Sequence, residues 1–284
     1  MAVGFQTVVG FSLLAVAAFR LPAATTVPLA VIKASVSDRD GGATLPASFA
    51  HEAGETMFFS FQIEGYAASS QERVHLSYKL DAFDPHGVRI MEPISAEIDE
   101  GLAPEDKNWK PTVHQEILIP PLADSGTYKI SIALTDVVGK ATAAKDLPFE
   151  VHGRRVDPSD TLVIRNIRFY RGEDDRQPMP KAAYRPGETV WARFDIIGFK
   201  YGEGNAIDVS YDVAVLAPSG KTLYSQPQAD ADRSQSFYPK RYVPAVMSLV
   251  TKRDTHPGEY VVVLTAHDGI GSQTFEARQS FTIE

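Results

Sequence analysis

The chain has 284 residues, of which 44% are hydrophobic and 23% charged, and it carries a formal net charge of −8. This composition excludes wholesale disorder and fits two medium-sized domains, and its 20 glycines and 19 prolines favour turns and short strands over long helices. The absence of cysteine excludes disulfides, Cys-ligated metal sites and thiol catalysis, and the acidic balance argues against a nucleic-acid partner.

The N-terminal segment is apolar. No charged side chain precedes Arg20, and the apolar run from Val8 to Phe19 has the length of a signal-peptide core and is short for a membrane span. Small residues follow between positions 23 and 30, as signal cleavage requires. We therefore expect residues 1–24 to form a signal peptide or, if uncleaved, a membrane anchor. The protein is then secreted or periplasmic in a bacterium, and it meets a membrane only through this segment.

The rest of the chain contains an internal repeat. The tripeptide at 54–56, Gly-Glu-Thr, recurs 133 residues later, and further matches at this spacing and then at 132 cover roughly a hundred residues. An aromatic-x-Pro-x-Val pattern at 109–113 matches 242–246 at the spacing of 133. A register this long predicts a tandem duplication, with domains at 25–153 and 154–284.

The two halves differ in charge. Residues 24–153 contain 19 acidic and 10 basic side chains, whereas residues 154–284 contain 17 of each. A charged partner should therefore distinguish between the two domains.

Each copy has the pattern of antiparallel strands. Apolar residues alternate with polar ones along the first copy's strands, as half-buried strands require. The expected strands of that copy cover 57–64, 74–83, 113–119, 127–134 and 147–151, with a turn at 84–87 and a long connection at 92–112. The second copy repeats the turn at 217–220 and the connection at 225–245. Six or seven short strands per copy predict a β-sandwich.

A sharper motif is Asp124-Ser-Gly-Thr-Tyr128, which the second copy keeps in part as His256-Pro-Gly-Glu-Tyr260. It resembles the D-x-G-x-Y stretch that opens strand F of immunoglobulin-like domains, where the tyrosine hydroxyl bonds to the backbone just upstream. The chain thus resembles tandem, Cys-free immunoglobulin-like or fibronectin-III-like modules of the bacterial type. We expect an all-β fold of two tandem immunoglobulin-like antiparallel β-sandwiches after the N-terminal segment.

No catalytic signature accompanies this fold. Gly220-Lys-Thr222 resembles the end of a P-loop but lacks the glycine that should precede it, and no G-x-S-x-G motif occurs. The seven histidines are scattered, and the acidic runs lack the further ligands of a calcium loop. We expect no catalytic residues, no metal site and no cofactor, and hence a non-enzymatic protein.

The aromatic residues allow two interpretations. Trp109 lies in a polar stretch, and Tyr238 and Tyr242 lie in the matching connection of the second copy. A flat ring in such a place can stack on a sugar, so these three are the candidate ligand contacts. An aromatic kept in both copies can equally close the sandwich at a crossover. Trp191 alternates with apolar residues, and we expect it in the core.

The second copy is also rich in clustered basic residues. Two interpretations are open for them: they face an acidic partner or the acidic first domain, or they are solvated residues that protect strand edges. These residues are Arg165, Arg168, Arg171, Lys240, Arg241, Lys252 and Arg253.

These features predict an exported, non-enzymatic binding or scaffolding protein of the bacterial envelope. Its partner would be an envelope protein or polysaccharide, contacted through the segments 92–112 and 225–245. One alternative is a carbohydrate-binding accessory module with an exposed Trp109. Another is a periplasmic chaperone-like protein, which should present an edge strand to its client.

Overall fold

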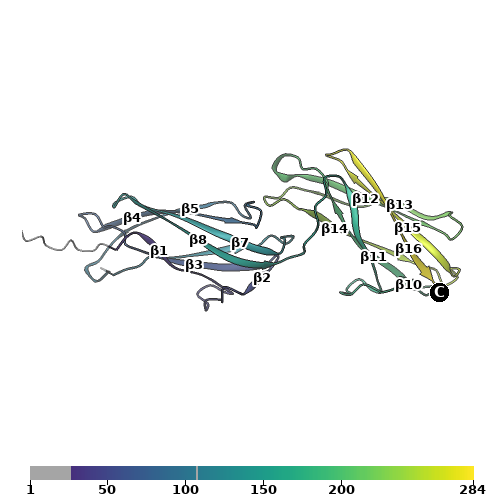
Figure 1. Cartoon of the computed structure of the whole chain (residues 1–284), viewed down its shortest axis with the longest axis horizontal. Coiled ribbons are helices and arrows are strands. Elements are labelled where there is room, and N and C mark those ends of the chain that lie inside the picture. The colour runs from purple at the N-terminus through teal and green to yellow at the C-terminus, as the bar shows by residue number, and fades with distance from the viewer. Residues whose placement is uncertain (1–26, 107) are drawn as a thin grey trace, which may run out of the picture.

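The computed structural model describes residues 27–106 and 108–284, and nearly all of its regular structure is β-strand (Figure 1). The predicted signal peptide or anchor at 1–24 lies outside the described residues. Within the described part, no helix is long and apolar enough to span a membrane.

The strands from β1 to β8 form a first sandwich of two sheets. One sheet has the order β1-β3-β6 and the other the order β2-β8-β7-β4-β5. All pairs are antiparallel except β2 with β8. The strand bounds are Ala30–Ser37 (β1), Ala50–Glu52 (β2), Thr56–Glu64 (β3), Arg73–Phe83 (β4), Ile94–Gly101 (β5), Thr112–Leu118 (β6), Gly126–Asp136 (β7) and Ala141–His152 (β8).

A second sandwich repeats this plan, and the two lie end to end (Figure 1). Its sheets have the orders β14-β11-β9 and β10-β16-β15-β12-β13. The strand bounds are Val163–Tyr170 (β9), Ala183–Tyr184 (β10), Thr189–Ile197 (β11), Ile207–Leu216 (β12), Thr222–Ser234 (β13), Tyr242–Val250 (β14), Gly258–Asp268 (β15) and Gln273–Ile283 (β16). The all-β sandwich architecture is therefore as predicted, whereas the boundary at 153/154 stays a prediction.

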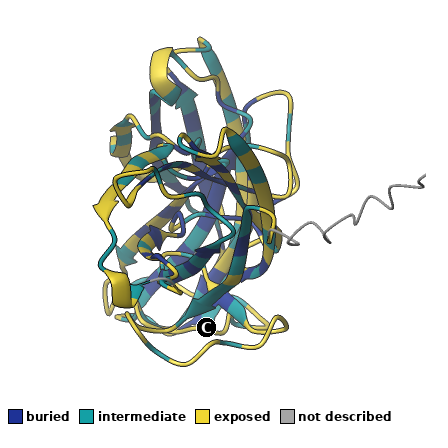
Figure 2. Ribbon diagram, turned by 90° about the vertical axis from the view of Figure 1, so that its left-hand side faces the viewer, coloured by how far each residue is buried: buried dark blue, intermediate teal, exposed yellow. Residues whose placement is uncertain are grey.

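Each core lies between its two sheets. Along β3 the inward side chains Met57, Phe59, Phe61 and Ile63 are at most 1% exposed, and their neighbours face outward. Burial of each such side chain stabilises the fold by about 1.5–3 kcal/mol. Figure 2 shows the same alternation of buried and exposed segments along the strands.

The tyrosine motif has the bond that its resemblance implies. The Tyr128 hydroxyl donates to the Asp124 carbonyl oxygen at 3.0 Å, and the Tyr260 hydroxyl donates to that of His256 at 2.7 Å. This confirms the immunoglobulin-like character of both sandwiches. The fibronectin-III-like subtype stays a prediction.

The duplication extends to backbone irregularities. The first strand of each sandwich has a register shift with a residue in the left-handed region, Lys33 (φ 49°) in β1 and Asn166 (φ 55°) in β9. These residues are 133 apart. Both copies also bury an aspartate, Asp136 or Asp268, which accepts backbone N–H bonds from the following turn. The repeat is thus one fold built twice, down to its bulges.

One part of the sequence alignment was wrong. Phe61 pairs with Val113, but its counterpart Phe194 pairs with Ala245 rather than Val246. The spacing between corresponding residues of the two copies is therefore 132 at β6 and β14, and not the 133 that the sequence match implied. A one-residue slip moves a side chain to the opposite face, and Val246 is accordingly 44% exposed.

Two further expectations are corrected by the strand pattern. The connections 92–112 and 225–245 are not loops throughout, because they contain β5, most of β13 and the start of β14. β5 and β13 are both edge strands without a fully buried side chain. β13 lacks the alternation that reveals a strand, whereas β5 alternates from Ile94 to Asp99 and could have been recognised. Trp191 lies outside the core, because the inward residues of β11 are Val190, Ala192, Phe194 and Ile196.

Candidate functional site

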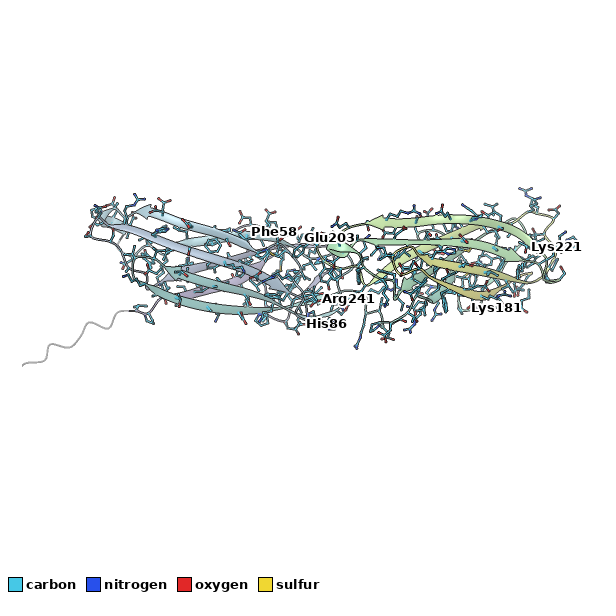
Figure 3. The ribbon with its side chains drawn as sticks, turned by 90° about the horizontal axis from the view of Figure 1, so that it is seen from above. Phe58, His86, Lys181, Glu203, Lys221 and Arg241 are labelled. Carbon is cyan, nitrogen blue, oxygen red and sulfur yellow. The ribbon has the colours of Figure 1, made fainter. Side chains whose placement is uncertain are left out.

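The junction between the sandwiches is held by charged and aromatic side chains. Asp84, in the turn after β4, accepts the backbone N–H groups of His86 and Val88 on Oδ1, both at 2.8 Å. This turn aims the second oxygen at the other sandwich. Oδ2 accepts the Tyr238 hydroxyl at 2.9 Å and the Arg241 guanidinium at 2.6 Å. Figure 3 shows His86 and Arg241 close together where the sandwiches meet.

A second carboxylate completes this cluster. Asp124, just before β7, lies 3.2 Å from Nε of Arg241 and 3.8 Å from Nε2 of His86. The Arg241 contact is an ion pair without hydrogen-bond alignment. The Asp84 side chain is fully buried, so Arg241 supplies the positive charge that its burial requires.

The pKa values of the cluster reflect burial. Loss of hydration raises the pKa of the Asp124 carboxyl, although Arg241 and His86 act in the opposite direction. Burial is also the main reason that the pKa of Tyr238 rises to about 12. The phenol therefore remains a hydrogen-bond donor to Asp84 at neutral pH.

The linker between the sandwiches adds an apolar contact. Val156 packs against Ile197 and Tyr242 of the second sandwich and is accompanied by Leu122 of the first. The Arg154 guanidinium carbon lies 5.4 Å from the centre of the Tyr242 ring, a cation–π contact. Tyr242 is thus enclosed by the linker.

An apolar hollow of about 590 Å³ opens beside these contacts. Both sandwiches line it, and Leu118 (56%) and Phe237 (42%) are exposed apolar side chains of its lining. Glu92, Glu116 and Lys240 are its charged lining residues.

The three predicted contact residues do not form one site. Tyr238 and Tyr242 are only 7% and 4% exposed, and both pack at the junction. They offer no ring face for stacking, because the other sandwich or the linker covers them. That they contact a ligand stays a prediction, and it would require the junction to open. Packing was the other interpretation of these aromatics, and the geometry of both tyrosines favours it.

Trp109 lies at the opposite end of the first sandwich. It is half-buried, its ring meets Tyr66 edge to face at 6.3 Å, and its carbonyl oxygen accepts the Tyr66 hydroxyl at 2.6 Å. A hollow of about 320 Å³ adjoins it, lined also by Leu102 and Pro111. Trp109 therefore remains accessible as a candidate contact residue.

Asp84 and Asp124 were not predicted to be junction residues, although both lie in recognised sequence motifs. Contact between the basic residues and the acidic first domain was one of the two interpretations from the sequence, and it is confirmed for Arg241. A usable signal was present in the repeat. Asp84 corresponds to Ala217 at the spacing of 133, so the turn itself does not require the aspartate.

Comparisons with known proteins add little. No protein-family model matches the chain, and no curated protein matches its sequence. Similar solved structures include the C-terminal domain of the Streptococcus pyogenes antigen I/II-family protein AspA, at 9% identity and a TM-score of 0.33, covering 90% of this chain and 99% of that one. The C-terminal domain of the Streptococcus agalactiae AgI/II polypeptide BspA has 10% identity and a TM-score of 0.31, with 90% and 100% covered. Superpositions this loose transfer neither a site nor a function.

No ready-made metal site accompanies the junction. Across residues 27–106 and 108–284, no group of three or more His, Asp or Glu side chains is arranged to hold a metal ion.

Proposed function

We propose that this chain is an exported, non-enzymatic binding or scaffolding protein of the bacterial envelope, and that its two sandwiches act as one rigid body. Its partner would be an envelope protein. The observation that carries the proposal is the junction in which Arg241 joins the buried Asp84 and neighbouring Asp124.

The chemistry of the junction favours a fixed orientation. If the sandwiches separate, Arg241 leaves Asp84, and both groups must find new partners. The Tyr238 hydroxyl bond to Asp84 is lost in the same movement. A hinge that opens freely would not link its strongest charges in this way. A spacer that presents surfaces at a set distance benefits from such a bond.

Substitution of the junction arginine tests the proposal. We expect Arg241→Gln to lower the free energy of unfolding by about 2 kcal/mol, because Asp84 loses the charge-assisted hydrogen bond from its cation. Small-angle scattering should show a wider spread of overall dimensions. In pull-downs from envelope fractions of the source bacterium, retention of the protein partner should fall about tenfold as the two surfaces lose their set spacing.

The matched control is Arg253→Gln, at an exposed arginine away from the junction. It should behave as the unsubstituted chain in all three measurements. Equal partner retention by Arg241→Gln and Arg253→Gln, despite a loosened junction, would remove the rigid-scaffold proposal. N-terminal sequencing of the mature protein tests export separately.

A carbohydrate-binding role is the second candidate, and the half-exposed Trp109 in its hollow favours it. Here a polysaccharide should quench Trp109 fluorescence, and Trp109→Ala should abolish retention on that polysaccharide. Under the scaffold proposal, Trp109→Ala leaves partner retention unchanged.

A further inference from the structure

The outer face of the β14-β11-β9 sheet has a groove of about 600 Å³. We call it the arginine groove, because Arg154, Arg168 and Arg193 line it together with Asn166 and Tyr170. Asp230, Phe194 and the β14 segment 244–246 complete its lining. The junction contacts described above use no residue of this groove except Arg154.

A bulge gathers the basic side chains onto this face. Arg165 and Arg168 are three residues apart, and a regular strand would place them on opposite faces. The bulge at Asn166 adds one residue to β9 and changes this. Arg165 pairs with Asp195, and Arg168 pairs with Arg193. Asp195 and Arg193 are two residues apart on β11, so they point to the same face. Both arginines of β9 therefore share the outer face with Arg193.

The result is a direct cross-strand pair of like charges, Arg168 with Arg193. Such a pair destabilises a sheet. Within the described part of the chain, neither guanidinium has a carboxylate within ion-pair distance, as the recorded ion pairs of the second sandwich involve other residues. Arg154, by contrast, is paired with the buried Asp195.

Arg193 is held in position without being neutralised. Its guanidinium lies 4.3 Å from the centre of the Tyr170 ring. It also donates to the backbone carbonyl oxygens of Glu173 and Asp175. Arg168 donates only to the carbonyl oxygen of its neighbour Ile167, at 3.1 Å. One fixed and one adjustable guanidinium thus face the same space.

The first sandwich provides an internal comparison. It has the same bulge at Lys33, but the positions that correspond to Arg168 and Arg193 are Ser35 and Ser60, which also pair directly. The fold therefore needs the bulge but not the arginines.

We propose that the arginine groove binds an oxyanion, namely the carboxylate, sulfate or phosphate group of a ligand, bridged by Arg168 and Arg193. Planar guanidinium groups match such groups in paired hydrogen bonds, and a shared anion converts their repulsion into attraction. This site goes beyond the proposed scaffold function and does not depend on it.

Tryptophan fluorescence provides the test in the full chain. Trp191 pairs with Tyr170 on the outer face and is partly exposed. Because the chain has only two tryptophans, Trp109→Phe leaves Trp191 as the sole reporter. This variant is titrated with phosphate, sulfate or glucuronate against chloride at constant ionic strength. We expect a saturable change in Trp191 fluorescence and a rise in Tm.

Arg168→Gln should weaken the apparent affinity about tenfold or more, whereas Arg253→Gln should leave it unchanged. In chloride alone, Arg168→Gln should raise Tm, because it removes the like-charge pair; a purely structural arginine would lower it. A preference for phosphate or sulfate over glucuronate would assign a phosphorylated or sulfated ligand, and the reverse preference an acidic sugar. Equal anion responses in the Arg168→Gln and Arg253→Gln variants, or a lower Tm of Arg168→Gln in chloride, would overturn the proposal.

Discussion

At the scale of single residues, the most informative groups are buried polar atoms with one defined partner. The Tyr128 side chain is fully buried, and its hydroxyl donates to a carbonyl oxygen four residues upstream. The same bond in the second sandwich shows that it belongs to the fold and not to a ligand site. Its loss should therefore lower the stability of the fold.

We expect Tyr128→Phe to lower the free energy of unfolding by about 1 kcal/mol, since the Asp124 carbonyl oxygen loses its donor. Urea unfolding followed by circular dichroism measures this change. Tyr224→Phe is the control, because Tyr224 is 36% exposed and bonds only to a side chain of its own strand. A Tyr128→Phe protein as stable as this control would contradict the assigned role.

The role of a residue could be predicted where a sequence motif specifies its hydrogen-bond partner. Tyr128 was recognisable because D-x-G-x-Y specifies a local bond. Trp191 was misplaced because apolar character alone does not give the phase of a strand. It lies three residues from Phe194, and on a regular strand the two cannot both face inward.

At the scale of elements, the bulges in β1 and β9 distinguish the two copies. Both need a residue in the left-handed region, which asparagine adopts more easily than lysine. The second copy has Asn166 there, whereas the first has Lys33. The first sandwich thus has a strained bulge residue.

Lys33→Asn should raise the free energy of unfolding by about 0.5–1 kcal/mol, because it relieves this strain. Thermal and urea unfolding test the change. The same substitution at Lys145, an exposed residue of the regular strand β8, should be neutral or slightly destabilising, because asparagine is disfavoured in strands. The expectation fails if both variants shift stability alike.

Strands with one buried face were predictable from the sequence, whereas largely exposed strands were harder to recognise. The central strands β3, β4 and β7 alternate clearly, whereas β13 is exposed along most of its length and has no period to detect. The difference between Asp84 and Ala217 marked the first turn as unusual, but the pairing of Asp84 with Arg241 was not predictable, because the two residues are 157 positions apart. No local pattern links residues at that separation.

At the scale of the whole molecule, buried tyrosines couple stability to alkaline pH. Burial is the main cause that raises the pKa of Tyr184, Tyr211 and Tyr238 to about 12, and it also raises the pKa of Tyr128. In the unfolded chain these groups ionise near pH 10. Between these values the folded protein keeps protons that the unfolded chain releases.

The contribution of these tyrosines to the free energy of unfolding is therefore fully present below about pH 10. It declines as the pH rises from about 10 to about 12. Urea unfolding at pH 8, 10 and 11 should show this decline. Tyr211→Phe removes one titrating group, so its stability should fall less steeply over this range. Equal slopes for the two proteins would show that Tyr211 does not contribute.

The end-to-end placement of two equivalent sandwiches has a consequence for assembly. A head-to-tail contact between like units is open, so in principle it can be propagated by adding further copies. The acidic end of the first sandwich, Asp84 and Asp124, has its counterparts at the far end of the second in Ala217 and His256. Neither carries a negative charge like that of the aspartates, and the positions of the first sandwich that correspond to Arg241, at the spacings of 133 and 132, are Asn108 and Trp109. Both halves of the ion pair are thus absent from the two outer ends, so the contact that joins the sandwiches is not repeated between successive chains.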